Sequence, residues 1–301
     1  MILLLGINVS LVIKKIHKRL TAFLLLLPLL TGCVKLVTGF SPTLIPNLTQ
    51  TFFEECDSEL ARVSLPADLK LMEGLLRNDP QNKQLLTALC MGFTGYSMLF
   101  VEEKDPERAS QLYLRARNYG LRALGRRDSF LKQSGLDAQD IRARLKTFGE
   151  REIEILFYTT MSWQAWINLN LDKPAALAQM VMAQACLERI LEVNPGYFYG
   201  APCVLMGTIL AARPRLAGGD ADKAKVYFDK AMQVSEGKFY FVHYYFARYY
   251  AVRIQDRRLF RALIQVVMQG NPSELKEVCL INTAMKKKAR KLLEMTEDLF
   301  L

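Results

Sequence analysis

The sequence predicts an all-α fold built from helical hairpins, on three observations. From residue 51 to residue 301, apolar side chains recur at intervals of three and four, the period of a helix that buries one face. Alternating Val, Ile and Thr, which would indicate strands, is scarce. Five clusters of turn-forming residues end one helical stretch and start the next, at residues 78–80, 104–106, 194–196, 217–220 and 270–272.

The first 32 residues have the features of a secretory signal peptide. Four basic side chains precede an apolar run over residues 20–30, namely Lys14, Lys15, Lys18 and Arg19. The run is shorter than the roughly 20 residues that a membrane-spanning helix needs, and Pro28 interrupts it. Its end, Leu30-Thr31-Gly32-Cys33, resembles a bacterial lipobox, in which the cysteine is lipidated after cleavage. An ordinary signal peptide and an uncleaved anchor are the alternatives.

We therefore expect lipidation at Cys33 and a mature chain anchored to a membrane in the periplasm, because two or more acyl chains give stable anchoring. Val34 does not decide between the inner and the outer membrane. Residues 33–50 contain Pro42 and Pro46 with little periodicity, which predicts a tether, and residues 51–301 form the predicted domain. The predicted signal peptide carries four of the 40 basic and none of the 30 acidic side chains. The basic excess that remains suits a neighbour of anionic lipid and is too mild to indicate nucleic acid.

Within the predicted domain, three helices carry a small–large–small pattern typical of tetratricopeptide repeats. In these helix pairs, small residues let two helices approach and large ones fill the gap to the next pair. The triplets are Ala109, Tyr113 and Ala116; Ala224, Phe228 and Ala231; and, more loosely, Ala183, Leu187 and Ile190. A further pair is expected to join His243, Phe246, Ala247 and Tyr250 to Leu259, Leu263 and Val266.

These patterns predict degenerate helical-hairpin repeats that form a compact α-solenoid. The helix expected over residues 280–299 would cap its last apolar face. Residues 117–152 and 168–183 do not fit a strict repeat, so an irregular all-helical domain is the alternative.

The residues give no case for an enzyme, a metal site or a bound cofactor. His243 is the one histidine after Cys33, and its aromatic neighbours favour a packed core residue. No P-loop, nucleophile elbow or cluster of zinc ligands is present in the sequence. Five cysteines besides Cys33 leave room for one disulfide, whose partners the sequence does not identify: Cys56, Cys90, Cys186, Cys203 and Cys279.

Clustered aromatic residues are the candidates for a ligand or interface site. They are Trp163, Trp166, Tyr197, Tyr199, Tyr240 and Tyr244. Such rings could line an apolar groove with polar hydroxyls, and ordinary core packing is the alternative. The basic run over residues 286–291 is expected to be a solvated helix face, with lipid head groups or an acidic partner as the alternative contact.

Four segments resemble one known family. They are SLPADLKLMEGLLRNDPQNKQLLTALCMGFTGYSMLFVEE, YLRARNYGLRAL, TTMSWQAWINLN and AGGDADKAKVYFDKAMQVSEGKFYFVHYYFA. Together with the lipobox they are similar to the T component associated with tripartite ATP-independent periplasmic (TRAP) transporters.

The resemblance implies a periplasmic lipoprotein of degenerate tetratricopeptide repeats without a catalytic residue. Its implied partners are the periplasmic TRAP substrate-binding protein (the P component) and further copies of itself, in a trimer. It also implies a cavity for a small hydrophobic or organic-acid ligand. A tetratricopeptide scaffold lipoprotein of outer-membrane protein assembly is the alternative function.

Overall fold

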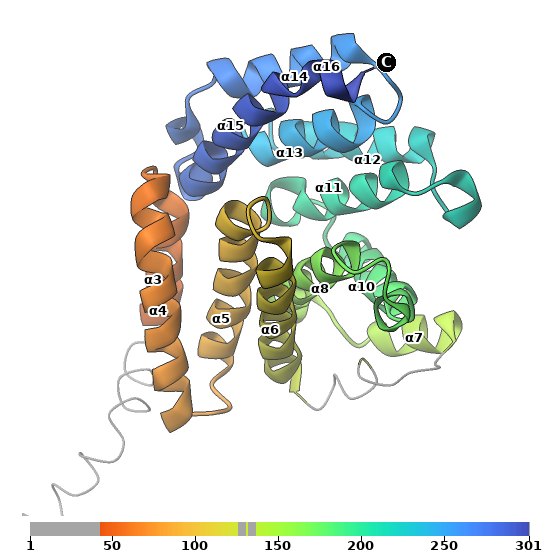
Figure 1. Ribbon diagram of the computed structural model, residues 1–301. Helices are drawn as coiled ribbons and strands as arrows, with labels where there is room; N and C mark the ends of the chain where they lie inside the picture. The colour runs from red at the N-terminus through yellow and green to blue at the C-terminus, as the bar shows by residue number, and fades with distance from the viewer. Residues whose placement is uncertain (1–42, 126–130, 132–136, 301) are drawn as a thin grey trace, which may run out of the picture.

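The computed structural model describes residues 43–125, 131 and 137–300, and these residues form helices joined by turns, with no strand among them (Figure 1). The predicted all-α class is therefore confirmed. The predicted signal peptide and Cys33 lie outside the described residues. Most hydrophobic side chains that are buried belong to one continuous core.

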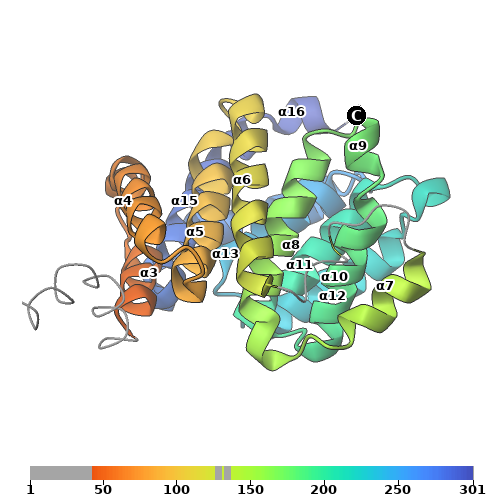
Figure 2. The same cartoon turned by 90° about the horizontal axis from the view of Figure 1, so that it is seen from below.

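The first half of the described chain is a row of helices in which α4, α5, α6, α8 and α10 each pack against the next (Figures 1 and 2). Its helices are α3 (Leu44–Glu54), α4 (Ser58–Asn78), α5 (Lys83–Tyr96), η1 (Ser97–Val101), α6 (Pro106–Leu124), α7 (Ala138–Leu145), η3 (Glu150–Glu152), α8 (Ile153–Asn168), α9 (Pro174–Leu177) and α10 (Met180–Val193).

The second half continues with α11 packed on α12, and with α13, η5, α14 and α15 beyond them. Its helices are α11 (Tyr197–Ala212), η4 (Arg215–Ala217), α12 (Ala221–Val234), α13 (Tyr240–Tyr245), η5 (Phe246–Ala251), α14 (Arg257–Gln269), η6 (Pro272–Val278), α15 (Cys279–Glu294) and α16 (Thr296–Leu299). From α14 the chain turns back, and α15 packs against α3 and α4 (Figure 1).

The predicted turns lie between helices, and polar side chains at several of them cap the helix that follows. The Asp105 carboxylate accepts a hydrogen bond from the Arg108 amide at 3.0 Å, with Pro106 in the first turn of α6. Asp220 does the same for the Lys223 amide at the start of α12. Such caps satisfy amides that have no partner inside the helix, which is why these residue types mark helix starts.

The helical domain begins several residues before residue 50, where the predicted tether ends. Helix α3 begins at Leu44, so the last part of the predicted tether is helical. Pro46 lies in the first turn, where its missing amide hydrogen costs no helical hydrogen bond. Ile45 is buried and belongs to the main core, which holds this helix against the rest of the chain.

The small–large–small triplets occupy the close contacts that their pattern predicts. Ala109, Tyr113 and Ala116 are buried on α6, which packs on α5. The triplet of α12 faces α11, where Gly207 approaches the ring of Phe228. Between these pairs, however, the short α7, η3 and α9 interrupt any strict period. The structure therefore has hairpin-like pairs within an irregular helical array.

One segment, Lys83–Val101, is long and apolar enough to cross a membrane by length and composition alone. It comprises α5 and η1, which pack against α3, α4, α6 and α8. Most of the segment is buried by these neighbours, and core packing accounts for its apolar character.

Candidate functional site

Where the two ends of the described chain meet, they enclose a cavity that we call the apolar slot. Its walls come from α3, α4, α5, η1, α8, α11, α13 and α15 and the residues flanking them, and include Phe53, Leu69, Met91, Phe157, Phe241 and Ile281. The volume of the cavity is about 70 Å³. The slot is therefore narrow, and a slender apolar chain fits it better than a bulky ring system.

Two glycines of α5 have different roles at this cavity. A Cβ atom on Gly92 would lie 2.6 Å from the Leu69 side chain, so this glycine lets α4 approach α5. A Cβ atom on Gly95 would meet no atom within 4 Å, although Gly95 lines the slot. Gly95 thus leaves open space where any other residue would project into the cavity.

Phe198 reaches the slot from a strained backbone. Its φ and ψ are 43° and 58°, in the left-handed region that non-glycine residues seldom adopt. Its ring contacts Phe53, Phe157 and Tyr158, with ring centroids 5.5, 6.4 and 6.1 Å away, and stands at 90° to the ring of Phe239. Strain of this kind persists where the surroundings fix it, and it clusters at ligand sites.

A wider and more polar vestibule adjoins the slot on one side. It is lined by Ile45, Gln50, Thr87, Arg151, Glu154 and Tyr197, among others. Several side chains line both cavities, and these include Thr49, Phe53, Met91, Tyr158 and Phe198. They form the boundary between the vestibule and the slot.

The slot itself offers almost no polar group to a ligand. Asp68, half-buried on α4, is the one charged side chain among the described residues that line it. Thr94 is buried there and donates to the carbonyl of Cys90 at 2.6 Å. Burial raises the pKa of Tyr158 well above its ordinary value, so its hydroxyl stays protonated. These walls favour binding through apolar contact.

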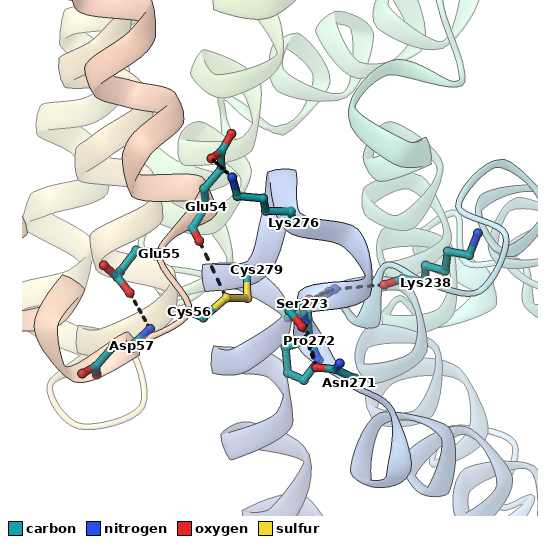
Figure 3. Close-up of a disulfide and its surroundings, with 11 residues drawn as sticks. Glu54, Glu55, Cys56, Asp57, Lys238, Asn271, Pro272, Ser273, Lys276 and Cys279 are labelled. Carbon is teal, nitrogen blue, oxygen red and sulfur yellow. Dashed lines mark hydrogen bonds and ion pairs between the residues drawn. A yellow bond between two sulfur atoms is a disulfide. The ribbon is translucent and has the colours of Figure 1, made fainter.

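A disulfide fastens two walls of the slot to each other. It joins Cys56, in the loop after α3, to Cys279, the first residue of α15 (Figure 3). Leu280 and Ile281 of the slot follow Cys279 directly, and Phe53 lies three residues before Cys56. The ion pair between Glu54 and Lys276, at 3.1 Å, links the same two segments (Figure 3).

The remaining cysteines are buried, and the described part of the chain offers no site for a metal ion. Cys90, Cys186 and Cys203 are buried free thiols. Burial raises the pKa of Cys186 to about 12, which keeps it an unreactive thiol. Within residues 43–125 and 137–300, no group of three or more His, Cys, Asp or Glu side chains is placed to hold a metal ion.

Of the six aromatic candidates, Tyr197 lines the vestibule, and the other five line neither the slot nor the vestibule. Trp163 is buried and donates from Nε1 to Gln179 at 2.8 Å, and the Arg117 guanidinium lies between its ring and that of Trp166 at 5.3 and 5.5 Å. Tyr199 packs on Phe239.

Tyr240 and Tyr244 are buried on α13. The Tyr244 hydroxyl accepts a hydrogen bond from Arg248 at 2.8 Å. A role of any of the six in binding stays a prediction. Their neighbours Phe198, Phe239 and Phe241 line the slot.

The sequence pattern did not indicate the residues of α3, α5 and α15 that complete the slot. Phe53, Gly95 and Ile281 lie in ordinary amphipathic stretches, and what sets them apart is the meeting of the chain ends.

The basic run over residues 286–291 is less solvated than expected. The Lys286 ammonium donates to the carbonyl of Gly270 at 2.7 Å, and Lys288 pairs with Glu103 at 2.8 Å. The exposed fraction of the Lys288 side chain is 11%. Lys287, Lys288 and Lys291 line a third cavity, between α4, η1 and α15.

Comparisons with known proteins identify a relative and a family for this chain. An uncharacterised protein of Treponema pallidum (strain Nichols) is 25% identical over 272 residues, which cover 85% of this chain and 84% of that protein. The family model described as TRAP transporter T-component matches residues 54–300, which is nearly the whole of the described helical array. The chain belongs to the TRAP transporter T-component family.

Proposed function

We propose that this chain is a lipid-anchored periplasmic protein that binds the substrate-binding protein of a TRAP system and holds a slender apolar ligand in the apolar slot. The family match over residues 54–300 carries the proposal, because the T component of a TRAP transporter is a transport accessory, which supports a role in transport. The match also favours transport over a scaffold in outer-membrane protein assembly. The slot and its vestibule supply a binding space of suitable shape.

The proposed location depends on the lipobox at Cys33 and is supported by the disulfide between Cys56 and Cys279. Disulfides of this kind persist in oxidising compartments such as the periplasm and are rare in the cytosol. Palmitate labelling of the wild type and of Cys33→Ala would test the anchor. Loss of the label and release of the protein from membranes are the expected results for the variant.

The proposed trimer of tetratricopeptide-like subunits would cover an apolar face of α4. Leu60, Val63 and Leu71 are exposed there at intervals of three and eight, so they share one side of the helix. A Val63→Glu, Leu71→Glu variant is expected to shift the mass measured by light scattering from trimer to monomer. The matched control is Leu216→Glu, because Leu216 is fully exposed in the 3-10 helix η4.

Binding of the purified mature protein to the P component from the same genome tests the proposed partnership. We expect a saturable complex in sedimentation or calorimetry. A P component of an unrelated TRAP system serves as the control. If the two proteins from the same genome are folded and do not associate, the proposed interaction with the P component is wrong.

A further inference from the structure

The cavity between α4, η1 and α15, which we call the basic groove, is lined by five cationic and two anionic side chains. The cations are Arg62, Lys104, Lys287, Lys288 and Lys291. The anions are Glu59 and Glu103, and Leu99, Phe100 and Ala284 contribute apolar surface. The groove therefore combines an excess of positive charge with some apolar surface.

The two glutamates do not neutralise this charge. Glu59 bridges Arg62 and Lys287 at 2.8 and 3.4 Å. Glu103 bridges Lys288 and Lys291 in the same way, at 2.8 and 3.3 Å. Burial raises the pKa of Glu103, but the hydrogen bonds from both lysines outweigh it and hold that pKa below its ordinary value. Each carboxylate is thus shared by two cations, and the fifth cation of the groove, Lys104, adds to the excess.

The basic groove begins where the apolar slot ends. Leu99 lines both cavities. On α4, Arg62 of the groove lies three residues before Leu65 of the slot, and on α15, Ala284 lies three residues after Ile281. Arg62 therefore lies about one helical turn from the slot wall along α4, whereas Lys287 lies six residues beyond Ile281 on α15.

From this juxtaposition we propose that the protein binds a single-chain amphiphile with an anionic head, the tail in the apolar slot and the head in the basic groove. The proposal rests on the proposed function, because it names the class of ligand that the slot takes. The small volume of the slot suits one chain better than two. Asp68 on the slot wall repels an anion there, which directs the head toward Lys104 and Lys287.

Calorimetric titration of the mature protein with dodecanoate and with 1-dodecanol, both below their aggregation concentrations, tests the proposal. The two probes share the chain length and differ in the charge of the head. We expect both to bind, with dodecanoate about fivefold tighter at low ionic strength. The difference is expected to shrink as salt is added, because these cations are partly exposed.

Substitution of lysines in the basic groove then tests whether these residues cause the difference in affinity between dodecanoate and 1-dodecanol. In Lys104→Gln, Lys287→Gln, dodecanoate is expected to lose its advantage while dodecanol binding stays unchanged. The control, Lys223→Gln, Lys230→Gln on α12, makes the same change of net charge away from the groove.

The outcomes separate this inference from the proposed function. If the wild type binds dodecanoate and 1-dodecanol with equal affinity, the inference that the groove binds an anionic head group is wrong. The proposal that the slot binds an apolar ligand would not be affected. Tighter binding of dodecanoate than of 1-dodecanol in the Lys104→Gln, Lys287→Gln variant would also contradict the inference. If neither probe binds, the slot as a site for a slender apolar ligand fails, and the inference fails with it.

Discussion

Cys56 and Cys279 are separated by 223 positions in the sequence and are joined by a disulfide, which closes the helical array. Helix α15 lies against α3 and α4, so the end of the described chain packs on its beginning (Figure 1). The apolar slot lies between these segments, and its shape depends on their staying together.

Removal of this disulfide is expected to destabilise the protein. A Cys56→Ser, Cys279→Ser variant should lose about 2–5 kcal/mol of unfolding free energy, because the cross-link restricts a long loop of the unfolded chain. Denaturant unfolding measures the change. Dithiothreitol should lower the stability of the wild type to that of the variant and leave the variant unchanged. A wild type that keeps its stability after thiol titration shows full reduction would contradict the account.

The contact between α11 and α12 should not tolerate a methyl group at Gly207. A Cβ atom there would lie 2.9 Å from the ring of Phe228 and 3.2 Å from the Ala224 carbonyl. Phe228 is buried and stacks on Phe246 at 4.7 Å, so it has little room to move. Gly207→Ala is expected to cost about 1–3 kcal/mol in denaturant unfolding.

The control for that substitution is Gly74→Ala on α4, where a Cβ atom meets nothing within 4 Å. It should stabilise the protein by about 0.5–1 kcal/mol, since alanine is the better helix former. Equal effects at Gly74 and Gly207 would show that the helices are less closely packed than described.

His243 is expected to make the protein sensitive to acid. Burial lowers its pKa from 6.5 to about 4 and outweighs a hydrogen bond with the backbone of Phe239, which acts in the opposite direction. Between these two values the unfolded chain binds a proton that the folded chain does not, so stability is lost as the pH falls from 6.5 to 4. The shift corresponds to a loss on the order of 3 kcal/mol.

Thermal unfolding of the wild type and of His243→Phe, from pH 7.5 down to pH 4, measures this effect. The difference in stability between the two proteins should change in favour of the variant as the pH falls below 6.5. Carboxylates contribute equally to both curves and cancel in the comparison. A difference that stays constant over this range would show that His243 does not carry the acid sensitivity.

Local chemistry explains which parts of this fold could be predicted from the sequence. Asp105 and Asp220 mark helix starts because a short polar side chain caps the amides next to it. The triplet of Ala109, Tyr113 and Ala116 predicts a close helix contact because its members share one face. Such signals depend on residues within a few positions of each other.

The apolar slot could not be predicted in this way, because its walls come from distant segments. Phe53 and Ile281 meet only through the return of α15, and nothing in the spacing of the cysteines identified the pair that fastens it. The left-handed backbone of Phe198 likewise depends on its surroundings. Gln179 and Arg117 contact Trp163 in the core, and its role in binding stays a prediction.

The central claim is that the slot holds a slender apolar ligand, and Gly95→Leu tests it most directly, because the new side chain would project into the open space beside Gly95. Gly74→Leu makes the same substitution on open α4 surface outside the slot and is the control. In calorimetric titration with 1-dodecanol, we expect the wild type and Gly74→Leu to bind alike. Gly95→Leu should bind about tenfold more weakly or not at all. Unchanged binding by a folded Gly95→Leu protein would contradict the account.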